Sequence, residues 1–129
     1  MSRRSWARAA LMADGVGCAL AAVGALAIGR LGDELDPISS ARIPLGAALA
    51  VTSAMLLGSA RDARDRDLSR AALVNTAWAL GCTAALTARH TRTSRLLVAT
   101  TAVADAAMAV TQWSLRSDRH GVGFRRADA

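Results

Sequence analysis

The sequence has no lysine and no tyrosine, and only 3% of its residues are aromatic. All 16 basic residues are therefore arginines, and the formal net charge is +6. A nucleic-acid-binding surface places its basic residues on one face with aromatic residues between them. Here the arginines stand at the ends of apolar segments, so the sequence predicts no nucleic-acid partner and favours contact with a lipid bilayer.

Charge is also nearly missing from four apolar stretches: residues 9–29, 43–60, 71–88 and 96–115. Each has 18 to 21 residues. As a helix, such a stretch is roughly 27–32 Å long, about the hydrocarbon thickness of a bilayer. The second and third stretches have no charge at any helical phase, whereas a helix of a soluble bundle needs a charged stripe toward water.

The pattern therefore predicts an all-α fold, a bundle of four transmembrane helices running up-down-up-down in one domain, residues 1–116. A soluble, alanine-rich four-helix bundle is the alternative. Residues 1–29 also fit an export signal, but Asp14 interrupts the apolar run, which is long for a signal. We predict a disordered cytoplasmic tail at 117–129, which contains two glycines and little to bury.

The arginines are unevenly divided between the two sides of the predicted bundle. Eleven lie in the N-terminal segment, the 61–70 connection and the C-terminal tail, and five lie in the other two connections. Because short cytoplasmic loops hold the excess of arginine, we predict a multi-pass protein of the plasma membrane with both termini cytoplasmic. Trp6 and Trp113 then lie at the same membrane interface, as anchors.

Recognisable catalytic and metal-binding patterns are lacking. The two cysteines, Cys18 and Cys82, fall inside predicted spans and have neither metal-site nor disulfide-framework spacing, so we expect them to pack as apolar residues. His90 and His120 lie outside the spans. There is no nucleophile elbow, Cys–His pair or phosphate-binding loop. The sequence predicts no enzyme, no metal site and no cofactor.

What the spans do contain is a small set of polar residues, which we predict to form an intramembrane polar seam: Asp14, Asn75, Trp78, Asp105 and Gln112. No span contains a cation to pair with the two acids. One hypothesis is that the seam holds the helices together in a protein of structural or accessory type. The other is an oligomeric proton-coupled transporter or small-molecule-binding protein that uses the two acids.

The first span also carries a row of small residues: Ala13, Gly17, Ala21 and Gly24. Three of them recur every four residues, and the two glycines are one heptad apart. Small residues in such a row let helix backbones approach closely in lipid. We therefore predict a packing face, either inside the bundle or between subunits of a homodimer or a larger membrane complex.

Three motifs carry a resemblance to known proteins over residues 9–115. They are Asp14-Gly15-x-Gly17 in the first span, Asn75-x-x-Trp78 in the third, and an acid plus a glutamine in the fourth. In this plan the chain resembles small uncharacterised four-helix integral membrane proteins of the actinobacterial type, which implies a membrane fold but no function.

The plan is also similar to small multidrug resistance transporters, four-helix protomers with a membrane acid in the first helix and a tryptophan in the third. Asp14 and Trp78 are the matching positions. The chain departs from that family because it has Asp where the family has Glu, no tyrosine, and a second acid at Asp105.

Overall fold

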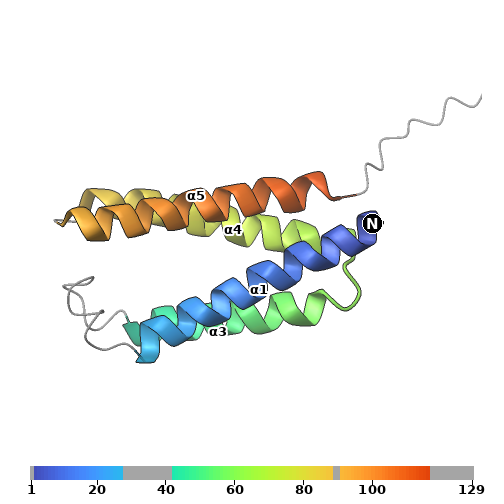
Figure 1. Ribbon diagram of the computed structural model, residues 1–129, viewed down its shortest axis with the longest axis horizontal. Coiled ribbons are helices and arrows are strands. Elements are labelled where there is room, and N and C mark those ends of the chain that lie inside the picture. The colour runs from blue at the N-terminus through green and yellow to red at the C-terminus, as the bar shows by residue number, and fades with distance from the viewer. Residues whose placement is uncertain (1, 28–41, 89–90, 117–129) are drawn as a thin grey trace, which may run out of the picture.

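The computed structural model describes residues 2–27, 42–88 and 91–116. Within these ranges the chain is helical and contains no strand. With the labels of Figure 1, the helices are α1 (Arg3–Ala27), α3 (Arg42–Ser59), α4 (Asp65–Ala85) with the short 3-10 helix η2 (Leu86–Ala88), and α5 (Arg92–Ser114). The prediction of an all-α fold of four helices is confirmed. The predicted tail, 117–129, lies outside the described residues.

The helices form two antiparallel hairpins, α1 with α3 and α4 with α5 (Figure 1). The hairpins meet at the end where α1 begins and α5 ends, and they diverge toward the other end (Figure 1). We call the first part the convergent end, residues 2–15, 53–75 and 109–116. The remaining described residues, 16–27, 42–52, 76–88 and 91–108, form the divergent end.

Local hydrogen bonds explain where α1 and α5 begin. Ahead of α1, the Ser2 hydroxyl accepts from the Ser5 N–H at 3.2 Å. Ahead of α5, the Thr91 hydroxyl accepts from the Ser94 N–H at 3.1 Å. Side-chain acceptors of this kind satisfy donors that the first turn of a helix leaves without partners. These caps extend both helices beyond the apolar stretches at 9–29 and 96–115.

The charged connection between the second and third apolar stretches is also partly helical. At its start the Asp67 carboxylate accepts from the Arg64 N–H at 3.2 Å. Asp65 and Asp67 stand in the first turn of α4, where negative charge is favourable near the positive end of the helix dipole. The third helix therefore begins at Asp65 and not at residue 71.

The apolar core lies at the convergent end. Its buried members come from α1, from α3 and the turn after it, and from α4: Ala7, Leu11, Leu56, Ala60, Leu68 and Ala71. The partly buried Ala63 and Leu115 pack against this cluster. The cluster therefore joins the two hairpins close to the charged connection.

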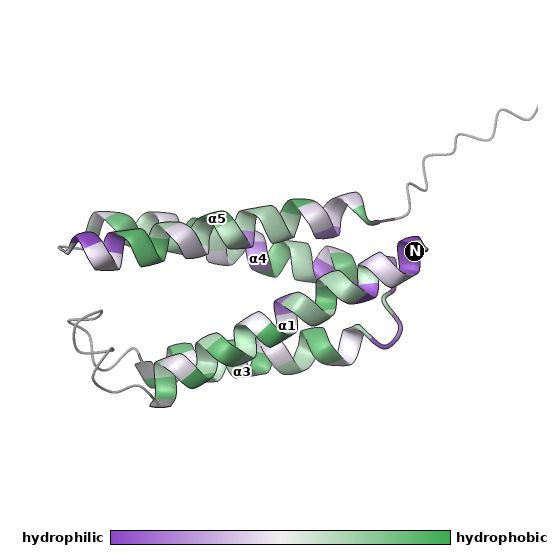
Figure 2. Cartoon of the chain, in the orientation of Figure 1, coloured by the Kyte–Doolittle hydropathy of each residue, from purple (hydrophilic) through white to green (hydrophobic). Residues whose placement is uncertain are grey.

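Three helical stretches of the described chain are long and apolar enough to cross a membrane: Arg3–Leu26, Asp65–Ala88 and Arg92–Ser114. The apolar part of α3, Ile43–Ser59, is shorter. Figure 2 shows apolar residues along all four helices, with strongly hydrophilic residues concentrated toward the helix ends. Length and composition are thus those of a multi-pass membrane protein.

Exposed hydroxyl groups in α4 and α5 bond within their own helices. The hydroxyls of Thr83 and Thr100 each donate to a carbonyl four residues earlier, both at 2.8 Å. Thr101 and Thr111 do the same. A hydroxyl bonded in this way leaves no unmet donor toward lipid, so these threonines are compatible with a membrane-spanning helix.

Candidate functional site

Three buried polar side chains from three helices meet at the convergent end. Asp14 of α1 is 8% exposed, Asn75 of α4 is 1% exposed and Gln112 of α5 is 0% exposed. The Asp14 Oδ2 atom accepts from Asn75 Nδ2 at 2.7 Å and from Gln112 Nε2 at 2.6 Å. Asn75 Nδ2 also donates to Gln112 Oε1 at 3.1 Å. These three bonds form a closed ring, the Asp14–Asn75–Gln112 network.

The network compensates a carboxylate that has been removed from water. A buried charge or polar group is costly unless hydrogen-bond partners replace its hydration. Here two amide donors converge on one carboxylate oxygen. The Cys18 thiol lies 4.0 Å from the other oxygen, Oδ1, one helical turn further along α1. The Asn75 amide nitrogen uses both of its N–H groups within the ring.

The network also connects the hairpins, because Asp14 belongs to the first hairpin and its two amide partners to the second. Asn75 lies ten residues after the start of α4, which is roughly 15 Å along the helix. Gln112 lies two residues before the end of α5. A glutamine side chain is long enough to reach the carboxylate from this position.

Asp105 and Trp78, the other predicted members of the seam, lie outside the ring. Asp105 is half-buried and hydrogen-bonds to no residue in the described part of the chain, although it lies close enough to Asp14 for an electrostatic interaction. It stands seven residues before Gln112, or roughly 10 Å further along α5. Trp78 is half-buried and donates no hydrogen bond to any described residue. The structure thus joins three of the five predicted residues.

Most of the predicted row of small residues faces away from the neighbouring helices of the described chain. Ala13, Gly17 and Ala21 are exposed, and a Cβ atom added at Gly17 or Gly24 would meet nothing within 4 Å. The close contact with α3 is made by Gly15, where an added Cβ would lie 2.8 Å from Leu57 Cγ. Two residues along a helix correspond to a rotation of about 200°, so Gly15 and Gly17 face opposite ways. Packing of the row between subunits stays a prediction.

Ser53 is a buried polar residue that the sequence reasoning missed. It is 5% exposed, and its hydroxyl donates to the Gly15 carbonyl oxygen at 2.7 Å. That contact ties α3 to α1 one residue after Asp14. The signal that could have found it is a serine in the interior of an uncharged stretch, because small hydroxyl residues are common at helix contacts in membranes.

The two predicted interface anchors lie at the convergent end, near the start of α1 and the end of α5. Trp6 and Trp113 are both more than half exposed. The Arg116 guanidinium lies 4.0 Å from the centre of the Trp113 ring, a cation–π arrangement. Their exposure and their place at one end of the molecule suit interface residues.

The arrangement offers hydrogen bonds between helices at a buried carboxylate. The described residues contain no group of three or more His, Cys, Asp or Glu side chains that could hold a metal ion. Cys18 and Cys82 lie in described helices and form no disulfide. Two open pockets lie at the convergent end, and no member of the network lines either of them.

No protein-family model, curated protein or solved structure matches this chain.

Proposed function

We propose that the chain is a small integral membrane protein of structural or accessory type, whose two hairpins are held together by the Asp14–Asn75–Gln112 network. The observation that carries the proposal is that these three buried side chains hydrogen-bond to one another. Two of the bonds join the first hairpin to the second. A catalytic group needs access to a substrate, and this carboxylate oxygen is already held by two amides. We therefore propose no enzymatic role.

Membrane residence and orientation belong to the same proposal. Three described helical stretches are long and apolar enough to span a bilayer. The excess of arginines on the 61–70 connection and near the termini favours cytoplasmic placement of both termini. Resistance of the membrane-bound protein to a carbonate wash tests residence. A C-terminal fusion to a fluorescent protein or to alkaline phosphatase tests orientation, and an active phosphatase would contradict it.

A double-mutant cycle tests the structural role of the network. Asp14→Ala and Gln112→Ala are made singly and together in the full chain, and each unfolding free energy is measured in mixed detergent micelles. Interhelical hydrogen bonds in membrane proteins are worth about 0.6–1.7 kcal/mol, so we expect a coupling energy of that size. The control cycle combines Asp14→Ala with Thr111→Ala. Thr111 is an exposed neighbour of Gln112 whose hydroxyl bonds within α5. Equal coupling in both cycles contradicts the proposal.

A second candidate function is proton-coupled transport or small-molecule binding by an oligomer. It is favoured by one observation, the half-buried Asp105 carboxylate, which interacts electrostatically with Asp14 and has no hydrogen-bond partner among the described residues. Intramembrane acids are common in proton and ion pathways. Reconstituted protein is tested for proton release on addition of a lipophilic cation, with Asp105→Asn as the matched variant. Absence of release from the wild type removes this candidate.

A further inference from the structure

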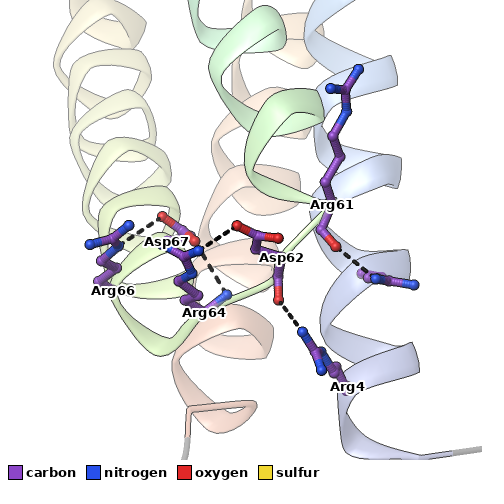
Figure 3. Close-up of polar contacts among 7 residues, drawn as sticks. Arg4, Arg61, Asp62, Arg64, Arg66 and Asp67 are labelled. Carbon is purple, nitrogen blue, oxygen red and sulfur yellow. Dashed lines mark hydrogen bonds and ion pairs between the residues drawn. The ribbon is translucent and has the colours of Figure 1, made fainter.

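Three arginines of α1 reach main-chain carbonyl groups of other elements at the convergent end. The bonds run from Arg3 Nε to the Leu115 oxygen at 3.0 Å, from Arg4 Nη2 to the Asp62 oxygen at 3.4 Å, and from Arg8 Nη2 to the Arg61 oxygen at 2.7 Å. Figure 3 shows the two contacts with the turn between α3 and α4. A guanidinium has five N–H donors, so each arginine keeps donors for a further acceptor.

An open pocket of about 420 Å³ lies beside two of these arginines, between the start of α1, the α3–α4 turn and the end of α5. Its lining combines charged side chains with apolar ones. The charged members are Arg3, Arg4, Asp62, Arg64 and Asp65, and the apolar members are Ala7, Ala63, Leu68 and Leu115. Ala7 and Leu68 belong to the buried core. The pocket therefore offers positive charge next to an apolar surface.

The negative charges of this region are largely engaged locally. Asp62 forms an ion pair with Arg64 at 2.7 Å, and Asp67 accepts from the Arg64 N–H and lies near Arg66 (Figure 3). Asp65 stands in the first turn of α4, where the helix dipole favours an acid. Within the described residues, neither Arg3 nor Arg4 contacts a carboxylate. Among the described residues, these two charges are thus not neutralised by an ion pair.

We propose that this pocket binds the headgroup of an anionic phospholipid, with Arg3 and Arg4 holding the phosphodiester and the partly buried Leu115 contacting the carbon chain next to it. Guanidinium groups bind phosphate oxygens through paired, charge-assisted hydrogen bonds. The inference rests on the proposed membrane residence, because a bilayer would place this end of the helices at headgroup level. Exposed Trp6 and Trp113 at the same end support that level.

The test compares lipid binding by two double variants of equal net charge in the full chain. Arg3→Gln with Arg4→Gln removes two of the three pocket arginines and leaves Arg64, which pairs with Asp62, in place. Arg66→Gln with Arg92→Gln removes two exposed cations that do not line the pocket. The purified proteins are titrated with phosphatidylglycerol and with phosphatidylcholine in detergent micelles, and retained lipid is counted by native mass spectrometry. Inorganic phosphate is added as a competitor in a separate arm.

We expect phosphatidylglycerol to bind in preference to phosphatidylcholine. Loss of Arg3 and Arg4 should weaken its binding roughly thirty-fold, about five-fold for each basic residue at an anionic surface. Arg3→Lys with Arg4→Lys should keep most of the binding, which separates loss of charge from loss of fold.

Two results overturn the inference. One is equal weakening in both double variants, and the other is displacement of the lipid by millimolar inorganic phosphate, which assigns the pocket to a soluble phosphate. Either result leaves carbonate-resistant membrane association intact. Failure of the proposed function would instead appear as extraction of the protein by carbonate.

Discussion

At the convergent end the two hairpins share a buried apolar cluster and a ring of three hydrogen bonds, whereas at the divergent end the tight contacts run within one hairpin. Gly46 of α3 is an example, because a Cβ atom added there would collide with the side chain of Leu26 in α1. Large apolar side chains of the divergent end, such as Leu20, Val51 and Val103, are exposed. Lipid tails are as apolar as these side chains, so no hydrophobic force draws them together in a bilayer. Association of the hairpins therefore depends on packing and directional bonds at one end.

The largest expected effect comes from the apolar cluster. Leu56→Ala removes a side chain that is 1% exposed, and we expect the unfolding free energy to fall by about 2–4 kcal/mol because a cavity remains. Unfolding by dodecyl sulfate in mixed micelles, followed by far-UV circular dichroism, measures this. The matched control is Leu80→Ala at the divergent end, where the leucine is 66% exposed and the change should stay within about 0.5 kcal/mol. Equal losses would show that the two ends are equally packed.

Next in size is the contrast between the two acids inside the apolar helices, Asp14 and Asp105. Asp14→Ala removes two short hydrogen bonds and leaves two amides without their shared acceptor, so we expect a loss of about 1–3 kcal/mol. Asp105→Ala removes no hydrogen bond among the described residues and should change stability by less than about 0.5 kcal/mol. The same unfolding assay compares them. A larger loss of stability in Asp105→Ala would indicate that the hairpins are held together nearer the divergent end.

A smaller effect separates the two faces of α1. Gly17→Ala should stabilise the helix by roughly 0.5–1 kcal/mol, because alanine has the higher helix propensity and open space surrounds the new methyl group. Gly15→Ala gains the same propensity, but its methyl group would lie 2.8 Å from Leu57 and 3.3 Å from Leu56. We expect the gain to be cancelled or reversed. A stabilising Gly15→Ala would indicate that α1 packs on α3 through another face.

An effect of similar size is expected at the turn between α3 and α4, beside the convergent end. Ala63 has a φ of 48°, a left-handed conformation that costs a residue with a Cβ atom roughly 1 kcal/mol relative to glycine. Ala63→Gly should therefore raise the unfolding free energy by about 0.5–1 kcal/mol. As a control, Ala54→Gly in the interior of α3 should lower it by about 1 kcal/mol. A loss at both positions would contradict the assignment of strain to the turn.

The membrane-like character of the helices could be read from the sequence because it depends on local composition. Runs of about twenty uncharged residues have few alternatives to a helix when charged residues border them, and the four helices lie where the runs lie. The boundaries were less predictable. Asp65 and Asp67 extend α4 into a segment that the charge pattern assigned to a connection. Acidic residues at the start of a helix are stabilised by the helix dipole, and they can also stay in contact with water.

The membership of the network was only partly predictable. Spacing along one helix shows that Asp105 and Gln112 lie on similar sides of α5, two turns apart. It does not show which of them stands level with Asp14, because that depends on the tilt and the relative shift of α1 and α5. Trp78 shares a face with Asn75 and still lies outside the ring, since it stands three residues further along α4, roughly 4.5 Å along the helix axis.

The sequence by itself determined that this chain forms apolar helices with arginine-rich ends, and that Asp14 needs polar partners in their interior. Helix length, charge and desolvation are properties of each segment, so they need no knowledge of its neighbours. Only the tertiary structure decided that Gln112 and Asn75 are those partners, that Gly15 and not Gly17 meets α3, and that the hairpins converge at one end. Those outcomes depend on helix rotation and crossing angle, which arise from contacts between segments far apart in the chain.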